Sequence, residues 1–126
     1  MGLFDKLKSA IKSEAKEEVI EREDLSGATI MDLLEKVDQY VNEYKDNVNK
    51  ATFVKLETAM LELANRMPSI PLAKRAHCRP YTDGYKSYLK NYENALKLGP
   101  AGATMVNAQS SALLLIISGM ASALAE

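Results

Sequence analysis

His77 and Cys78 are the residues best suited to acid–base or nucleophilic chemistry, and each is the only one of its type. Adjacent side chains in an extended segment point apart, so the two do not make a nucleophile–base pair. They supply only two metal ligands, and one cysteine excludes an intrachain disulfide and a four-cysteine zinc site. The sequence also lacks a Glu-x-x-His motif, a phosphate-binding loop and a nucleophile elbow. We therefore expect no catalytic residue, no cofactor and no metal site, and we interpret Cys78 as an ordinary loop thiol.

The charged residues exclude further classes of function. Across 126 residues, 16 lysines and arginines face 17 aspartates and glutamates, giving a net charge of −1. This balance does not favour nucleic acid as a partner, because nucleic-acid binders are usually basic. The charges are unevenly placed: the net charge is +2 over 1–13, −4 over 14–24, −2 over 25–67 and +4 over 68–97, whereas 98–125 has none. The length allows one domain with one core.

Helical periodicity dominates the chain, so we predict an all-α fold. Apolar residues recur at helical spacing over about 29–48, 50–67, 81–98 and 101–125, and no segment alternates as a strand would. Thr29, with Asp32 three residues later, has the pattern of a helix capping box. We predict a helical bundle of these four helices, with antiparallel neighbours and a Pro-containing loop at 68–80. We expect residues 25–126 to form that domain and 1–24 to form a separate N-terminal element.

The N-terminal element, about 2–23, is predicted to be an amphipathic helix. The stretch GLFDKLKSAIKS resembles short cationic amphipathic peptides and the opening of phage-shock-type membrane-remodelling proteins. We do not expect it to be a signal peptide, because it lacks an uninterrupted apolar stretch and a cleavage site. We expect its apolar face to pack on the bundle, on another subunit or on an anionic membrane surface. The candidate docking or membrane-facing residues are Leu3, Phe4, Leu7, Ile11, Lys8 and Lys12.

The chain carries no charge from Leu98 to Ala125, a run that includes the whole predicted C-terminal helix. Its strongly apolar part, 112–125, is shorter than the roughly 20 residues needed to span a bilayer. Three environments remain open for it: the interior of the chain, an interface between subunits, or a membrane. Because the helix at 29–48 has only one apolar stripe, we expect part of this apolar surface to be shared between chains. The candidate interface residues on this helix are Leu113, Ile116, Met120 and Leu124.

Four tyrosines at helical spacing share one face of the predicted helix at 81–98, namely Tyr81, Tyr85, Tyr88 and Tyr92. Tyrosine supplies a large contact area with a polar tip, which is typical of protein interfaces. The alternatives are core packing and stacking of single-stranded nucleic acid, and the balance of charge does not favour the latter.

These observations predict a non-enzymatic protein that works by self-assembly or by association with another protein. The charge-free helix and the tyrosine face would carry that association. The alternative is a peripheral membrane-active protein that docks through its N-terminal helix and inserts the C-terminal one. An enzyme or small-ligand binder that uses the tyrosine face and His77 is the weakest hypothesis, and no small-molecule substrate is evident. A single unpaired cysteine favours the cytoplasm, at the membrane if the alternative holds.

Overall fold

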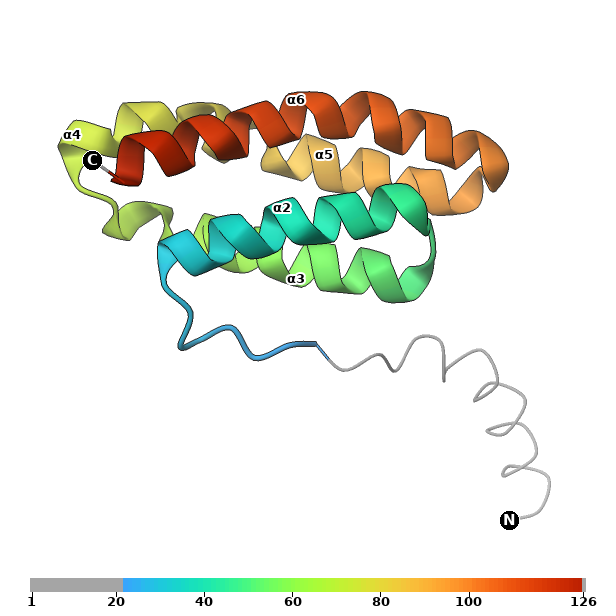
Figure 1. The fold of residues 1–126 in the computed structure, drawn as a ribbon, viewed down its shortest axis with the longest axis horizontal. Coiled ribbons are helices and arrows are strands. Elements are labelled where there is room, and N and C mark those ends of the chain that lie inside the picture. Colours follow the sequence, from blue (N-terminus) through green and yellow to red (C-terminus); the bar gives the residue numbers. More distant parts are fainter. Residues whose placement is uncertain (1–21, 126) are drawn as a thin grey trace, which may run out of the picture.

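A computed structural model describes residues 22–125 of the chain (Figure 1). Within that range all regular structure is helical, which confirms the all-α prediction. The elements are α2 (Ile30–Asp46), α3 (Lys50–Arg66), the 3₁₀ turn η1 (Met67–Ser69), α4 (Leu72–Arg75), the 3₁₀ turn η2 (Ala76–Cys78), α5 (Arg79–Lys97) and α6 (Pro100–Ala125).

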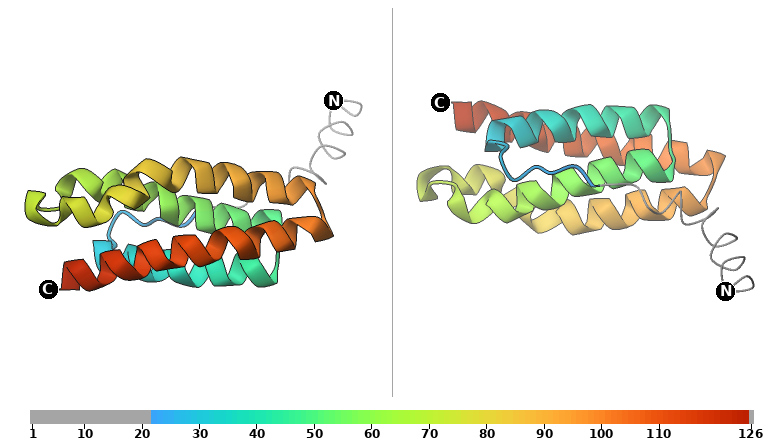
Figure 2. Two further views of the ribbon diagram at one scale, coloured as in Figure 1. Left: turned by 90° about the horizontal axis from the view of Figure 1, so that it is seen from above. Right: turned by 90° about the horizontal axis from the view of Figure 1, so that it is seen from below.

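The four long helices lie side by side around one core (Figures 1 and 2). α2 packs against α3 and α6, and α5 packs against the same two helices. The order around the core is therefore α2, α3, α5, α6, with α2 and α5 diagonally opposed. The largest fully buried side chains include Tyr44, Tyr81, Tyr92 and Phe53.

Local signals fix where the helices begin and end. The capping box predicted at Thr29 and Asp32 is confirmed, because each side chain accepts a hydrogen bond from the backbone of the other residue. Asn49 and Thr52 form a second capping box at the start of α3. Gly99 lies between α5 and α6 with φ at +60°, a conformation that glycine adopts without steric cost.

The connection between α3 and α5 differs from the loop expected at 68–80. It consists of two 3₁₀ turns and the short helix α4, and α5 begins at Arg79 rather than near residue 81. The reason is Pro80, which lies in the first turn of α5. A proline fits there because the first amide groups of a helix have no intrahelical partner.

Residues 22–29 form a non-helical strap that lies beside α2 and α3 (Figure 2). Arg22 pairs with Glu57 of α3, Glu23 pairs with Lys36 of α2, and the Leu25 side chain is buried. The helix predicted over 2–23 therefore does not extend through Arg22 and Glu23, whose side chains hold the strap to two different helices. The rest of that prediction lies outside the described residues.

The same limit applies to the six candidate docking residues in the N-terminal segment. They are Leu3, Phe4, Leu7, Lys8, Ile11 and Lys12, and the structure describes none of them.

Candidate functional site

Helix α6 buries one face in the core and exposes the opposite one. The buried positions are Gly102, Val106, Ser110, Leu113, Ile117 and Met120. Among the exposed residues of the opposite side, which also include polar ones such as Asn107 and Ser111, five follow alternating spacings of four and three: Ala108, Ala112, Leu115, Gly119 and Ser122. Leu115 stands out among them with 75% of its surface exposed. We call these five residues the outer seam of α6.

Two glycines of α6 show that one face of the helix is in close contact with a neighbouring helix and the other is open. A β-carbon on Gly102 would lie 2.1 Å from the backbone oxygen of Ala95, so the contact between α5 and α6 requires a glycine there. A β-carbon on Gly119 would meet nothing within 4 Å. Packing within the chain therefore gives no reason for Gly119, although an interior glycine costs a helix about 1 kcal/mol relative to alanine.

The structure places the predicted interface residues of α6 on its inner side. Leu113 and Met120 are buried in the chain's own core, and Ile116 and Leu124 are half-buried. Only one face of α6 is covered within the chain, so the helix is not enclosed by its neighbours. The sequence signal for the outer seam is the four–three spacing of its small residues around Leu115, whereas the large apolar side chains on which the prediction relied lie on the inner side. Among residues 22–125, α6 is also the one helix long and apolar enough to cross a membrane.

The tyrosine face of α5 also consists of buried residues and partly exposed ones. Tyr81 and Tyr92 are fully buried, so their side chains are not available to a partner. The Tyr81 hydroxyl donates to the backbone oxygen of Met60 at 2.6 Å, and the Tyr92 hydroxyl lies 3.1 Å from that of Ser110. Burial raises the pKa of Tyr92 to about 12. Tyr85 and Tyr88 are half-buried, and the Tyr85 ring stacks on Tyr81 with ring centres 5.6 Å apart.

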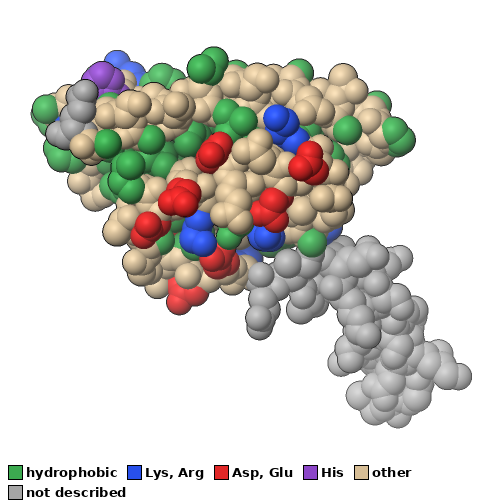
Figure 3. Space-filling view, in the orientation of Figure 1, with side chains coloured by type: hydrophobic (Ala, Val, Ile, Leu, Met, Phe, Trp, Pro, Cys, Tyr) green, Lys and Arg blue, Asp and Glu red, His purple; other side chains and the backbone are tan. Residues whose placement is uncertain are grey.

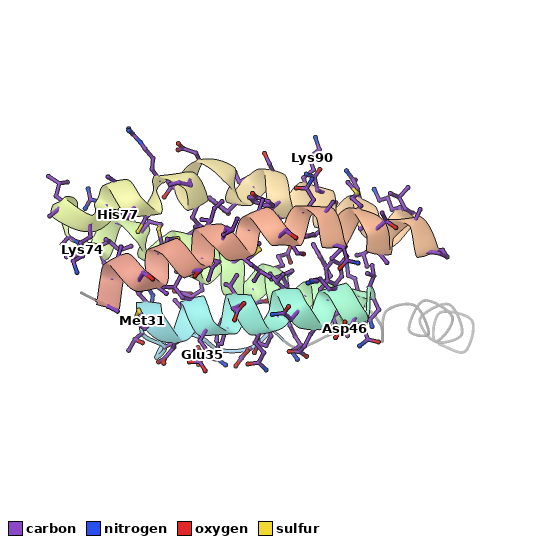
Figure 4. All side chains as sticks on the ribbon, turned by 45° about the horizontal axis from the view of Figure 1, so that its top comes forward. Met31, Glu35, Asp46, Lys74, His77 and Lys90 are labelled. Atoms are coloured by element: carbon purple, nitrogen blue, oxygen red, sulfur yellow. The ribbon has the colours of Figure 1, made fainter. Side chains whose placement is uncertain are left out.

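His77 and Cys78 lie in the turn η2 beside α4, at one end of the molecule (Figure 4). The segment is helical rather than extended, which corrects the geometry assumed for the pair. Cys78 is fully buried, with its sulfur 3.8 Å from the backbone oxygen of Lys74. Burial raises the pKa of this thiol, which disfavours the reactive thiolate. The described part of the chain holds no group of three or more histidine, cysteine or acidic side chains placed to bind a metal ion.

A groove of about 520 Å³ lies between α2 and α6. Its apolar lining comes from both helices: Met31, Leu34, Leu114, Ile117 and Ala121, with Ser118 beside them. Three carboxylates of α2 form its acidic rim: Asp32, Glu35 and Asp38. Figure 3 shows this face, with hydrophobic side chains gathered between the two helices and acidic ones along α2. Sequence reasoning missed the groove because its two sides are far apart in the chain.

The rim carboxylates lack cationic partners among residues 22–125. The ion pairs of that range use Glu23, Glu43, Glu57 and Glu62. Lys36, the basic residue between Glu35 and Asp38 in sequence, is paired with Glu23 of the strap. The groove thus combines an apolar lining with a negative edge.

Comparisons of the chain with models of protein families, with curated proteins and with solved structures found no match.

Proposed function

We propose that this protein is a four-helix bundle that functions by self-association through the outer seam of α6. The observation that carries the proposal is the uncovered face of a 26-residue helix that has no charged residue. Soluble helices normally place charged side chains opposite their buried face. Here that side presents Leu115 with small neighbours, a surface that a second helix would cover.

The seam has the spacing that two packed helices require. Alternating steps of four and three give a period of 3.5 residues, which keeps one line of residues facing a partner helix. Small residues such as Ala112 and Gly119 let two backbones approach closely. The same surface on two copies is self-complementary about a two-fold axis, and the absence of charge removes like-charge repulsion. Gly119, unexplained within one chain, has a role in that contact.

The half-buried tyrosines of α5 are the second part of the proposed association surface. Tyr85 and Tyr88 keep part of their rings accessible, whereas Tyr81 and Tyr92 are enclosed in the core. A protein partner other than a second copy would use the same surfaces. The proposal assigns the protein no catalytic activity.

The decisive experiment is the mass of the protein in solution. Light scattering over micromolar concentrations is expected to give a mass above the 13.9 kDa of one chain. Leu115→Glu should reduce it to the monomer, because association would bury the new carboxylate. Leu72→Glu is the matched control, since Leu72 is 77% exposed but lies in α4.

A wild-type protein that stays monomeric over this range, with no protein partner recovered from cells, contradicts the proposal. So does an equal loss of mass in the Leu115→Glu and Leu72→Glu variants, because the effect would then not be specific to the seam.

The second candidate is membrane association, which the length and apolar composition of α6 favour. Lys74 lies at the C-terminal end of α6, where its ammonium donates to the backbone oxygen of Ala123 at 3.0 Å, and Arg75 follows it in sequence. A basic end suits an anionic lipid surface. In this hypothesis residues 2–23 form an amphipathic helix that makes the first contact, and α6 inserts afterwards.

Flotation with anionic vesicles tests the second candidate. Wild type should float, and Phe4→Glu/Leu7→Glu should not, because both substitutions place charge on the apolar face of the N-terminal segment. Absence of vesicle binding, or binding unchanged in the double variant, argues against it. Deletion of residues 2–12 separates the two functions: it spares self-association through α6 and abolishes vesicle binding.

A further inference from the structure

The groove between α2 and α6 is an apolar depression with one charged edge, and it lies on a different side of α6 from the outer seam. Leu34 and Ile117 form the buried part of its lining, whereas Met31 remains 42% exposed. An exposed apolar lining flanked by carboxylates that form no ion pair within residues 22–125 suits an occupant that is apolar on one side and basic along its edge.

We infer that the N-terminal segment of the same chain, residues 2–12, docks in this groove. The segment has the chemistry of such an occupant. Leu3, Phe4, Leu7 and Ile11 fall on one face of the helix that the sequence predicts there. Lys8 and Lys12 lie one turn apart on an edge of that face.

The charges of the two surfaces are complementary. Residues 1–13 carry a net charge of +2, and the groove rim contributes three negative charges. Glu35 and Asp38 lie one turn apart on α2, as Lys8 and Lys12 do in the predicted helix. Docking that places the lysine edge along α2 pairs the two sets while Phe4 and Leu7 face the apolar lining.

The strap fixes the point from which the N-terminal segment must reach the groove. Glu23 is held at α2 by the Lys36 ammonium at 2.9 Å and by the Tyr40 hydroxyl. Lys36 directly follows the rim residue Glu35, so the strap meets α2 at the level of the groove. Arg22, the first described residue, pairs with Glu57 of α3, so the path from Arg22 to the groove passes over α2 and covers about two helix diameters, roughly 20–24 Å. Residues 13–21 span up to about 30 Å when extended, so the segment reaches the groove within its own chain.

The docked state has a consequence for the membrane alternative. The face that would contact lipid is the face that contacts the groove, so the two contacts exclude one another. The groove would therefore hold the N-terminal segment away from membranes until an anionic surface competes for its lysines.

A tryptophan placed at position 4 tests the inference in the full-length chain. The protein contains no tryptophan, so Phe4→Trp provides a single reporter with little interference. We expect its emission to be shifted to the blue relative to the same variant in denaturant. Glu35→Lys/Asp38→Lys should remove the shift, and Lys8→Glu/Lys12→Glu in the same chain should restore it.

A matched control changes the same amount of charge elsewhere. Asp46→Lys/Glu93→Lys replaces two exposed acids outside the groove, Asp46 being at the far end of α2 from Met31 (Figure 4). This variant should keep the shifted emission. Circular dichroism confirms that each variant keeps its helical content.

Three results overturn the inference. The first is emission equal to that of the denatured protein, since the indole of the Phe4→Trp variant would then be exposed to water. The second is a shift lost equally in the groove and control variants, which would reflect net charge alone. The third is a shift that disappears on dilution, because the segment would then dock on a second copy. A shift that is independent of concentration and removed only by the groove variant supports docking within the chain.

Discussion

Tyr44 of α2 and Tyr92 of α5 are joined across the diagonal of the four helices. The Tyr44 hydroxyl donates to the backbone oxygen of Tyr92 at 2.6 Å, and the two rings meet edge to face with centres 5.6 Å apart. Both side chains are fully buried. One residue thus joins two helices that are not direct neighbours around the core.

Removing the Tyr44 hydroxyl tests this link. We expect Tyr44→Phe to lower the free energy of unfolding by about 1 kcal/mol, because the aromatic packing survives and one buried hydrogen bond is lost. Urea denaturation followed by circular dichroism measures the change. Tyr85→Phe is the control: Tyr85 is half-buried, and its loss should stay within about 0.5 kcal/mol. Equal effects in both variants would show that the diagonal bond contributes nothing specific.

The buried tyrosines predict sensitivity to alkali. Burial raises the pKa of Tyr92 from 10.0 to about 12, and it also raises those of Tyr44 and Tyr81. A raised pKa means that the folded state holds the phenolic proton more tightly than the unfolded state. The resulting stability is fully present below pH 10 and is lost as the pH rises from 10 towards 12.

The Tyr92→Phe variant measures how much of the loss of stability at high pH comes from Tyr92. It should be less stable at pH 7, because the contact with Ser110 is lost, and should fall less steeply between pH 10 and 12. Denaturation series at both ends of this range give the slopes. Parallel slopes for wild type and variant would contradict a role for Tyr92.

The two glycines of α6 should respond in opposite directions to alanine. Gly102→Ala is expected to destabilise the fold by about 1–3 kcal/mol, because the new methyl group meets the backbone of Ala95. Gly119→Ala is expected to stabilise a single chain by about 0.5–1 kcal/mol, because the site is open and alanine favours the helix. Thermal unfolding of both variants in the Leu115→Glu background keeps association out of the comparison. Destabilisation by Gly119→Ala in that background would show an intrachain contact that the structure lacks.

Gly119→Leu then addresses the seam itself. A leucine there should leave the single chain folded but weaken self-association, because two backbones could no longer approach closely. Light scattering of this variant beside Gly119→Ala checks the expectation. An unchanged mass for Gly119→Leu would move the contact to another part of α6.

Arg66 is expected to hold the strap in place. Its guanidinium donates to the backbone oxygens of Leu25, Ser26 and Ala28 at 2.7–3.2 Å. Arg66→Met keeps much of the stem but loses these bonds, and we expect a loss of about 1–3 kcal/mol. Hydrogen exchange should show faster exchange at Ala28, whose amide donates to the Leu25 oxygen, with little change in α5. An Arg66→Lys variant should not restore the slow exchange at Ala28, because lysine lacks the planar guanidinium with its several N–H donors. An unchanged exchange rate at Ala28 would contradict this role of Arg66 and would indicate that the buried Leu25 side chain holds the strap.

Much of the fold follows from local sequence signals. The periodicity of Leu33, Leu34 and Val37, the capping pair Thr29 and Asp32, and the stop at Gly99 predict helices close to those observed. Pro80 was less informative, because proline ends helices and also suits their first turn. The connection was therefore expected to be a loop, although it contains helical turns.

The candidate sites were harder to predict because they depend on which helix faces which. Tyr81 and Tyr85 share a face in the sequence pattern, but only the packed structure shows that one is buried and the other is partly free. The groove needs Leu34 and Ile117 together, and periodicity says nothing about a contact between residues so distant in the chain.

The order in which the helices pack also bears on how the chain folds. α2 pairs with α3 and α5 pairs with α6, so each half of the described chain is a hairpin of successive helices. Contacts between residues close in sequence form rapidly, because little chain entropy is lost in closing short loops. Each hairpin should therefore gain structure early, within microseconds to milliseconds. The Tyr44–Tyr92 bond, which joins one hairpin to the other, reports when the two halves have met.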